Sequence, residues 1–174
     1  MNTRTITESP SRLIAFFAAG LCVLTASSYI SVPMFPVPVT MQTLAIVMVG
    51  ALAGPRLGTA IVMSWLGLSI MVAPVLAGGK TGIIAFTGPT AGYLAAFPIA
   101  ALLGGLVARA SNSVIHFVGF LGVHAIILAA GWVWLATLIG PEAAFTSGVA
   151  PFAIGALLKS GLAASLLVAL TKRP

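Results

Sequence analysis

Residues 113–138 read SVIHFVGFLGVHAIILAAGWVWLATL and contain no Asp, Glu, Lys or Arg. About 20 consecutive apolar residues are enough for a helix to cross the hydrocarbon core of a bilayer. This stretch therefore predicts a transmembrane helix. It sets the fold class for the rest of the chain, because a segment of this kind has no place on the surface of a water-soluble domain.

Similar apolar runs occur on both sides of this stretch, separated by short segments rich in Gly, Pro or charge. With the central stretch they predict six membrane helices, near 12–31, 39–54, 57–77, 90–108, 113–138 and 150–171. The second run is shorter than a full span. We count it because an odd number of spans would disturb the charge distribution described below.

The composition agrees with an integral membrane protein. Of 174 residues 60% are hydrophobic and only 6% charged, and the mean hydropathy is +1.17; soluble domains carry roughly 25% charged residues. Six spans use nearly the whole length, so residues 1–174 form a single integral membrane domain with no room for a soluble catalytic domain. The net charge of +6 is better explained by membrane orientation than by nucleic-acid binding.

Basic residues alternate with the predicted spans. If the N-terminus is cytoplasmic, Lys80 is the only basic residue in an outer loop, and the inner segments hold Arg4, Arg12, Arg56, Arg109, Lys172 and Arg173. Cytoplasmic segments of membrane proteins carry an excess of Lys and Arg. The pattern predicts six helices, both termini cytoplasmic, and a multi-pass protein.

Irregular backbone is expected mainly on the outer side. The first outer loop, SVPMFPVPVT at 31–40, has three prolines and should be stiff and extended. The second contains Gly78, Gly79 and the 88–90 turn, and the third covers residues between Pro141 and Pro151. Gly78 and Gly79 are either a lid that brings backbone close to a ligand or a plain flexible turn. Because irregular backbone at membrane depth lines cavities, we expect a ligand site here.

Lys159 is the one basic residue inside a predicted span. It lies on the order of 12 Å along the last helix from Pro151, within the roughly 30 Å apolar core. A lysine at that depth costs about 2.5–3.5 kcal/mol and usually faces the interior of the bundle. It could instead snorkel to the outer interface. Because the chain has no Asp, we favour a ligand carboxylate as its partner.

Other polar residues give weaker signals. His116 and His124 are eight residues apart without further ligands nearby, so no metal site is predicted, and no residue set supports an enzyme. Tyr93, just after the 88–90 turn, fits either the core or a site. Ala15 and Ala19 form a small-xxx-small pair, suited either to packing inside the bundle or to docking of another subunit.

Several motifs together resemble the BioY family, the biotin-specific substrate-binding (S) components of energy-coupling-factor (ECF) transporters. The matching segments, in family order, are PVPVTMQTL (36–44), GALAGPRLG (50–58), AGG (77–79), GPTAGYL (88–94) and GVAPF (148–152), followed by Lys159. They cover most of the chain. The resemblance implies the S-component fold of six transmembrane helices, with biotin held near the outer face under the first loop and the loop between helices three and four.

The resemblance also implies a function and partners. The chain would capture biotin and deliver it inward by docking onto a transmembrane coupling protein with two ATPase subunits; Ala15 and Ala19 match the family's docking pattern. Biotin is then a transported ligand, no cofactor is needed, and the location is the cell membrane. Its carboxylate could pair with Lys159, and its ureido ring needs donors and acceptors. Candidate contacts are Lys159, Tyr93, Thr40, Gln42, Thr43, Gly78 and Gly79.

One position departs from the family pattern. The resemblance implies an Asp three residues before Lys159, where this chain has Ala156. Residues three apart meet on one helix face, so that Asp would neutralise the lysine. Its absence predicts that binding is weaker, or altered, relative to family members with Asp.

Two other functions compete with the capture subunit. A stand-alone facilitator or channel for a small anionic solute would need polar residues along a continuous path, but here they gather on one side. A membrane scaffold would leave Lys159 and the elaborate outer loops unused. Capture of biotin is the interpretation that uses most of the unusual residues.

Overall fold

The computed structural model describes residues 10–71, 73–81 and 83–171 and is mostly helical. Arg4, Gly82, Lys172 and Arg173 lie outside the described residues. Two of the described helices, α5 (Ser113–Ile139) and α7 (Ala150–Thr171), are long and apolar enough to cross a membrane. Three shorter helices are also apolar: α1 (Pro10–Tyr29), α2 (Gln42–Ala53) and α4 (Ala91–Val107).

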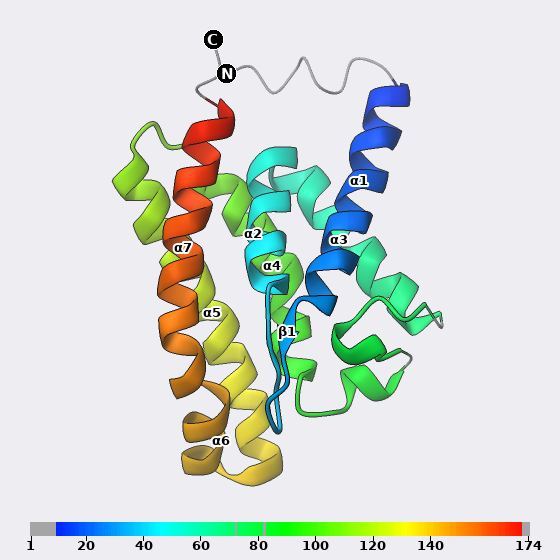
Figure 1. Cartoon of the computed structure of the whole chain (residues 1–174), viewed down its shortest axis with the longest axis vertical. Coiled ribbons are helices and arrows are strands. Elements are labelled where there is room, and N and C mark those ends of the chain that lie inside the picture. Colours follow the sequence, from blue (N-terminus) through cyan, green and yellow to red (C-terminus); the bar gives the residue numbers. More distant parts are fainter. Residues whose placement is uncertain (1–9, 72, 82, 172–174) are drawn as a thin grey trace.

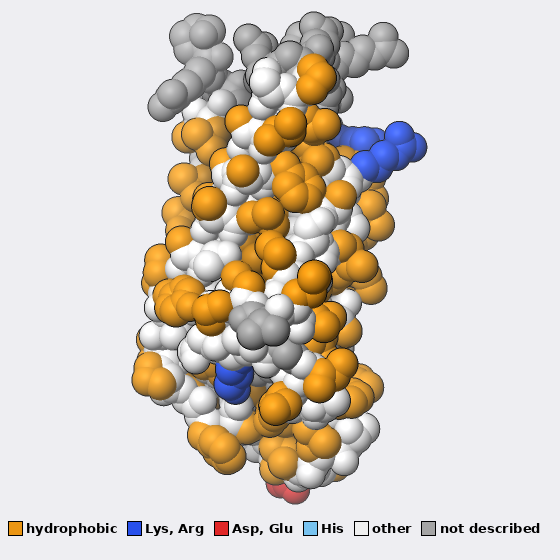
Figure 2. Space-filling view, turned by 90° about the vertical axis from the view of Figure 1, so that its right-hand side faces the viewer, with side chains coloured by type: hydrophobic (Ala, Val, Ile, Leu, Met, Phe, Trp, Pro, Cys, Tyr) orange, Lys and Arg blue, Asp and Glu red, His pale blue; other side chains and the backbone are white. Residues whose placement is uncertain are grey.

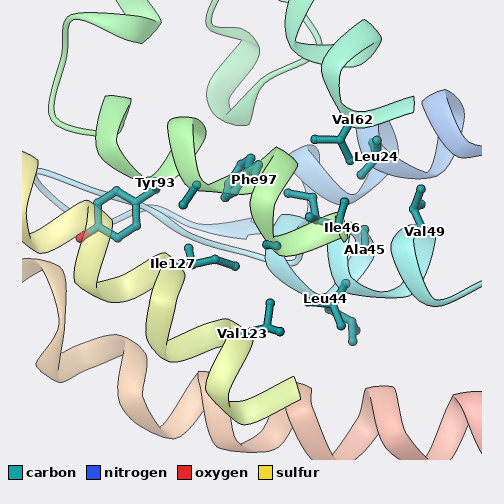
Figure 3. Packing of buried hydrophobic residues seen from close by; sticks show 14 of the residues in the cluster. Leu24, Leu44, Ala45, Ile46, Val49, Val62, Tyr93, Phe97, Val123 and Ile127 are labelled. Atoms are coloured by element: carbon teal, nitrogen blue, oxygen red, sulfur yellow. The ribbon is translucent and has the colours of Figure 1, made fainter. Parts of the chain in front are cut away.

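The helices form one bundle around α2 and α4 (Figure 1). α4 packs against α2, α3 (Pro55–Ile70) and α5, and α7 packs against α5 and α2. Figure 3 shows buried side chains from α1 to α5 meeting in this core, among them Leu24, Ile46 and Phe97. The outside of the bundle is apolar as well, since hydrophobic side chains cover most of the face in Figure 2.

α2 explains why the second apolar run is short. Its 12 residues reach about 18 Å, well below the roughly 30 Å thickness of a bilayer core. Residues 44–50 of this helix are all buried, so the bundle surrounds it. It lies close to α4 because Gly50 has no side chain: a Cβ there would lie 2.1 Å from the carbonyl oxygen of Ala101.

The first predicted loop contains a short β-hairpin. β1 (Ser31–Val32) pairs antiparallel with β2 (Val39–Thr40), and Ser31 lies opposite Thr40. The three prolines fall outside both strands, as expected for residues that cannot complete a ladder. The hairpin delivers Thr40 directly to the start of α2.

Three sequence-based expectations were wrong. The second predicted helix begins at Gln42 instead of 39, because Val39 and Thr40 form β2. The third predicted helix ends at Ile70 instead of 77, and the segment after it includes the 3₁₀-helices η2 (Ala77–Gly79) and η3 (Ile83–Phe86). The third predicted outer loop contains α6 (Pro141–Gly148). Gly140, with φ 86°, makes the turn into α6, and Pro141 begins the helix with its fixed φ.

The connections separate into two ends of the bundle (Figure 1). The start of α1, the end of α7, and the α2–α3 and α4–α5 connections lie at the upper end. Arg56 is the second residue of α3, and Arg109 belongs to the α4–α5 turn. The tip of the hairpin and α6 lie toward the lower end.

Candidate functional site

A cavity of about 70 Å³ lies between the hairpin, α2, η2, α4, α5 and α7. Five predicted ligand residues line it: Thr40, Gln42, Thr43, Tyr93 and Lys159. Segments more than 100 residues apart in sequence therefore meet at one place. The remaining lining residues are mostly apolar, namely Val37, Pro38, Val39, Leu76, Ala77, Lys80, Ala85, Thr90, Leu94, Phe97, His124, Ile127, Leu128, Phe152, Gly155 and Ala156.

Lys159 is half-buried on α7 and forms hydrogen bonds to the end of the β-hairpin and the start of α2. Its Nζ donates to the carbonyl oxygen of Thr40 at 2.5 Å and to the hydroxyl of Thr43 at 3.2 Å. It lies nine residues into α7, about 14 Å along the axis. Both recorded partners are uncharged. Glu142, the only acidic residue in the described part of the chain, is exposed on α6. Among the residues that the structure describes, no acidic side chain therefore pairs with Lys159 at the cavity.

Gln42 forms hydrogen bonds that connect the hairpin to α1. Its Nε2 donates to the Ser28 hydroxyl at 2.9 Å, and its Oε1 accepts from the Thr40 hydroxyl at 3.1 Å. The Ser28 hydroxyl in turn donates to the carbonyl of Leu24 at 2.9 Å. Gln42 lines the cavity, but both ends of its amide already have protein partners. These hydrogen bonds hold Thr40 in place against α1.

Tyr93 forms one wall of the cavity and connects α4 to the junction between α6 and α7. Its hydroxyl donates to the carbonyl oxygen of Gly148 at 2.7 Å. Its ring lies 6.3 Å from that of Phe152, centroid to centroid. Gly131 makes room for it, because a Cβ at that position would lie 2.1 Å from the Tyr93 ring. Figure 3 shows Tyr93 lying beside α5, near Ile127.

Gly78 and Gly79 lie next to the cavity without lining it; their neighbours Ala77 and Lys80 do. Both have left-handed backbone, with φ 69° and 68°. No atom lies within 4 Å of a Cβ built on either residue, so glycine is required here by conformation and not by space. This segment is tied to α1, because the Tyr29 hydroxyl donates to the carbonyl of Pro74.

Sequence reasoning considered His124 only as a metal ligand and did not include Phe152 among the site residues. Both line the cavity. A polar residue inside an apolar span is by default a functional candidate, and that signal was available for His124. Phe152 belongs to the segment GVAPF at 148–152, but nothing in an aromatic residue beside a helix start separates a cavity wall from core packing.

The cavity combines two lysine side chains, Lys80 and Lys159, with several hydroxyl groups and apolar walls. Such a site suits a small ligand that has an acidic group on a largely apolar body. The α1 positions Ala15 and Ala19, predicted as a packing or docking face, are both exposed on the described part of the bundle.

Comparisons with known proteins point to one family. Residues 1–174 match the sequence model described as the BioY family. The chain is 35% identical to the probable biotin transporter BioY of Pyrococcus horikoshii, over 87% of this chain and 89% of that protein. It is 34% identical to the biotin transporter BioY of Rhizobium etli, over 88% of each.

A solved structure resembles the bundle over nearly its full length. It is a crystal structure of the S-component for biotin from an ECF-type ABC transporter. The TM-score is 0.83 at 25% sequence identity, and the match covers 94% of this chain and 93% of the other.

Proposed function

This chain belongs to the BioY family, and from that premise we propose that it is the biotin-binding membrane subunit of a vitamin uptake system. It is a transport protein and not an enzyme, and biotin is its transported ligand instead of a resident cofactor. The subunit captures biotin at the outer face of the cell membrane and delivers it inward with an ATP-driven coupling module.

The observation that carries this proposal is Lys159 at the cavity with two uncharged partners. A lysine ammonium at membrane depth is stabilised by an anion, and hydrogen bonds between charged groups are about twice as strong as neutral ones. Biotin brings a carboxylate together with an apolar chain and a fused ring. Tyr93, Phe97 and Phe152 provide apolar walls for the uncharged part.

The chain arrangement supports a six-span, multi-pass orientation with both termini in the cytoplasm. Arg56, at the start of α3, and Arg109, in the α4–α5 turn, lie at the end of the bundle where α1 starts and α7 ends. Glu142 lies on α6, toward the opposite end. This asymmetry fits the positive-inside rule. In this orientation the hairpin and the cavity beside it face the outside of the cell.

The coupling module of the proposal is a transmembrane coupling protein with two ATPase subunits. Ala15 and Ala19 are exposed, so α1 has a face of small side chains that a helix of another subunit could approach closely. We assign docking of the coupling protein to this face.

Capture is distinguished from free conduction by transport across a sealed vesicle. We expect the purified chain, reconstituted alone, to bind labelled biotin without letting it equilibrate across the membrane. Accumulation should require an energy-coupling-factor module and ATP. Equilibration by the chain alone would support a stand-alone facilitator, and absence of biotin binding would refute the proposal altogether.

A further inference from the structure

His124 lies in the middle of α5 and lines the cavity, yet it takes no part in the contacts of Lys159. Only 2% of the residue is exposed. A buried imidazole among apolar side chains is unfavourable unless both of its nitrogens have partners. The partners of the two ring nitrogens therefore determine whether His124 can donate or accept a hydrogen bond in the cavity.

The neighbours of Nδ1 determine which nitrogen carries the proton. Nδ1 lies 2.9 Å from the carbonyl oxygen of Phe120, which can only accept, and 3.0 Å from the hydroxyl of Ser160. That hydroxyl donates its single proton to the carbonyl of Ala156 at 2.7 Å, so it accepts from the ring. Both contacts require hydrogen on Nδ1. In the neutral ring, Nε2 then has a lone pair and acts as an acceptor.

Nε2 is buried and has no hydrogen-bond partner among the residues that the structure describes. The nearby acceptors each already have one donor: the carbonyl of Thr40 accepts from Lys159, and Oε1 of Gln42 accepts from the Thr40 hydroxyl. Lys159 itself has only donors. Nε2 of His124 is therefore a cavity-lining acceptor that has no donor in the described part of the chain, and a ligand N–H could supply one.

We propose that His124 is a ligand-binding residue, whose Nε2 accepts a hydrogen bond from a ureido N–H of biotin. This inference rests on the proposed function, because it assumes that biotin occupies this cavity. Lys159 and His124 then select opposite features of one ligand. The lysine binds an oxygen that accepts, and the histidine binds a nitrogen that donates. A ligand with a carboxylate but without N–H groups would satisfy only the first.

The test is a cycle of two proteins and three ligands, measured as equilibrium binding in detergent. The proteins are the parent chain and His124→Phe, which keeps a ring but loses the acceptor. The ligands are biotin and its two analogues methylated at one or the other ureido nitrogen. We expect His124→Phe to bind biotin roughly three- to tenfold more weakly. The penalty for methylating one of the two nitrogens should shrink in His124→Phe.

His116→Phe is the matched control. His116 is buried on the same helix and also has a ring nitrogen without a partner in the described chain, but it does not line the cavity. Its substitution should leave biotin affinity unchanged. His124→Gln, which keeps an acceptor oxygen, should bind biotin more tightly than His124→Phe does.

The outcomes distinguish a failure of this inference from a failure of the proposed function. If the parent does not bind biotin, the proposed function fails and the inference fails with it. If the parent binds biotin but His124→Phe binds equally well, only the role of His124 is refuted. Loss of affinity with the same methylation penalty in both proteins would also refute it, because His124 would then act through packing. If no His124 variant is recovered folded, binding of the three ligands to the parent chain is the test. Tighter binding of biotin than of a methylated analogue then supports the inference, and equal binding of all three ligands overturns it.

Discussion

Lys159 holds its ammonium against a backbone carbonyl and a threonine hydroxyl, with no acidic side chain three residues before it. Ala156 occupies that position and lines the same cavity, only 8% exposed. The family resemblance implies an Asp there. In the proposed function, the carboxylate of the ligand would then compensate the charge of Lys159.

Restoring the carboxylate should therefore change binding. The departure at Ala156 led us to expect weaker or altered binding, so Ala156→Asp should raise biotin affinity, by roughly three- to tenfold if the new carboxylate orients Lys159 and adds a charged hydrogen bond. Ala156→Asn, which adds similar volume without charge, is the control. Titration of labelled biotin on the three purified proteins measures the effect. Equal affinities of the parent and Ala156→Asp would refute the expectation that the missing Asp weakens or alters biotin binding.

Three residues show which features of the site could be predicted from the sequence and which could not. Lys159 could be chosen because a charge inside an apolar span is conspicuous, and the structure does put it at a cavity. Gln42 lines the cavity as predicted, but the sequence did not show that its amide also binds Ser28 and Thr40. His124 was considered only as a metal ligand and was dismissed because no further ligands lie nearby in sequence. The positions of Ser160 and Phe120, which orient its ring, are known only from the folded bundle.

At the scale of elements, close helix contacts depend on glycines. Gly50 on α2 lies against the backbone of Ala101 on α4, so a methyl group there must push the two helices apart. We expect Gly50→Ala to destabilise the protein by about 1–3 kcal/mol, the usual cost of overpacking a core. Thermal unfolding in detergent measures this.

Gly122 supplies the matched control for that prediction. It lies within α5, and no atom lies within 4 Å of a Cβ placed there. Gly122→Ala should leave the midpoint temperature unchanged or raise it slightly, since alanine is the better helix former. If Gly50→Ala unfolded at the same temperature as the parent, the close α2–α4 contact would be wrong.

Continuous apolar runs predicted the long elements and missed the short ones. The apolar run at 150–171 has the same bounds as α7, and the run at 113–138 ends one residue before α5 does. α6 was read as loop because PEAAFTSG mixes small, polar and apolar residues, although Pro141 and Glu142 in its first turn are ordinary helix-start signals. The strand pair depends on contacts between residues 31 and 40, which no local pattern specifies.

At the scale of the whole molecule, the proposed orientation predicts which side of the membrane each loop faces. Cys22 is the only cysteine, so Cys22→Ala gives a background without thiols. In that background we expect Glu142→Cys to react with a membrane-impermeant maleimide on intact cells. Arg109→Cys should react only after permeabilisation. The opposite pattern would invert the topology.

Docking and binding should be separable if α1 carries the coupling interface. Ala15→Leu and Ala19→Leu place bulk on an exposed face that lies outside the cavity lining. Biotin affinity should stay at the parent value, while ATP-driven uptake with the coupling module falls at least severalfold. Ala125→Leu, an exposed position on α5, is the control. Normal uptake by both α1 variants would exclude this face as the docking site.

Equilibrium binding of labelled biotin to the purified chain, compared with Lys159→Ala, tests the central claim most directly. Leu158→Ala, at the exposed neighbouring position, serves as the control. We predict that the parent and Leu158→Ala bind equally, and that Lys159→Ala loses roughly 10- to 100-fold in affinity, as expected when a charged hydrogen-bond partner is removed. A parent that does not bind biotin, or a Lys159→Ala variant that binds as tightly as the parent, would contradict the account.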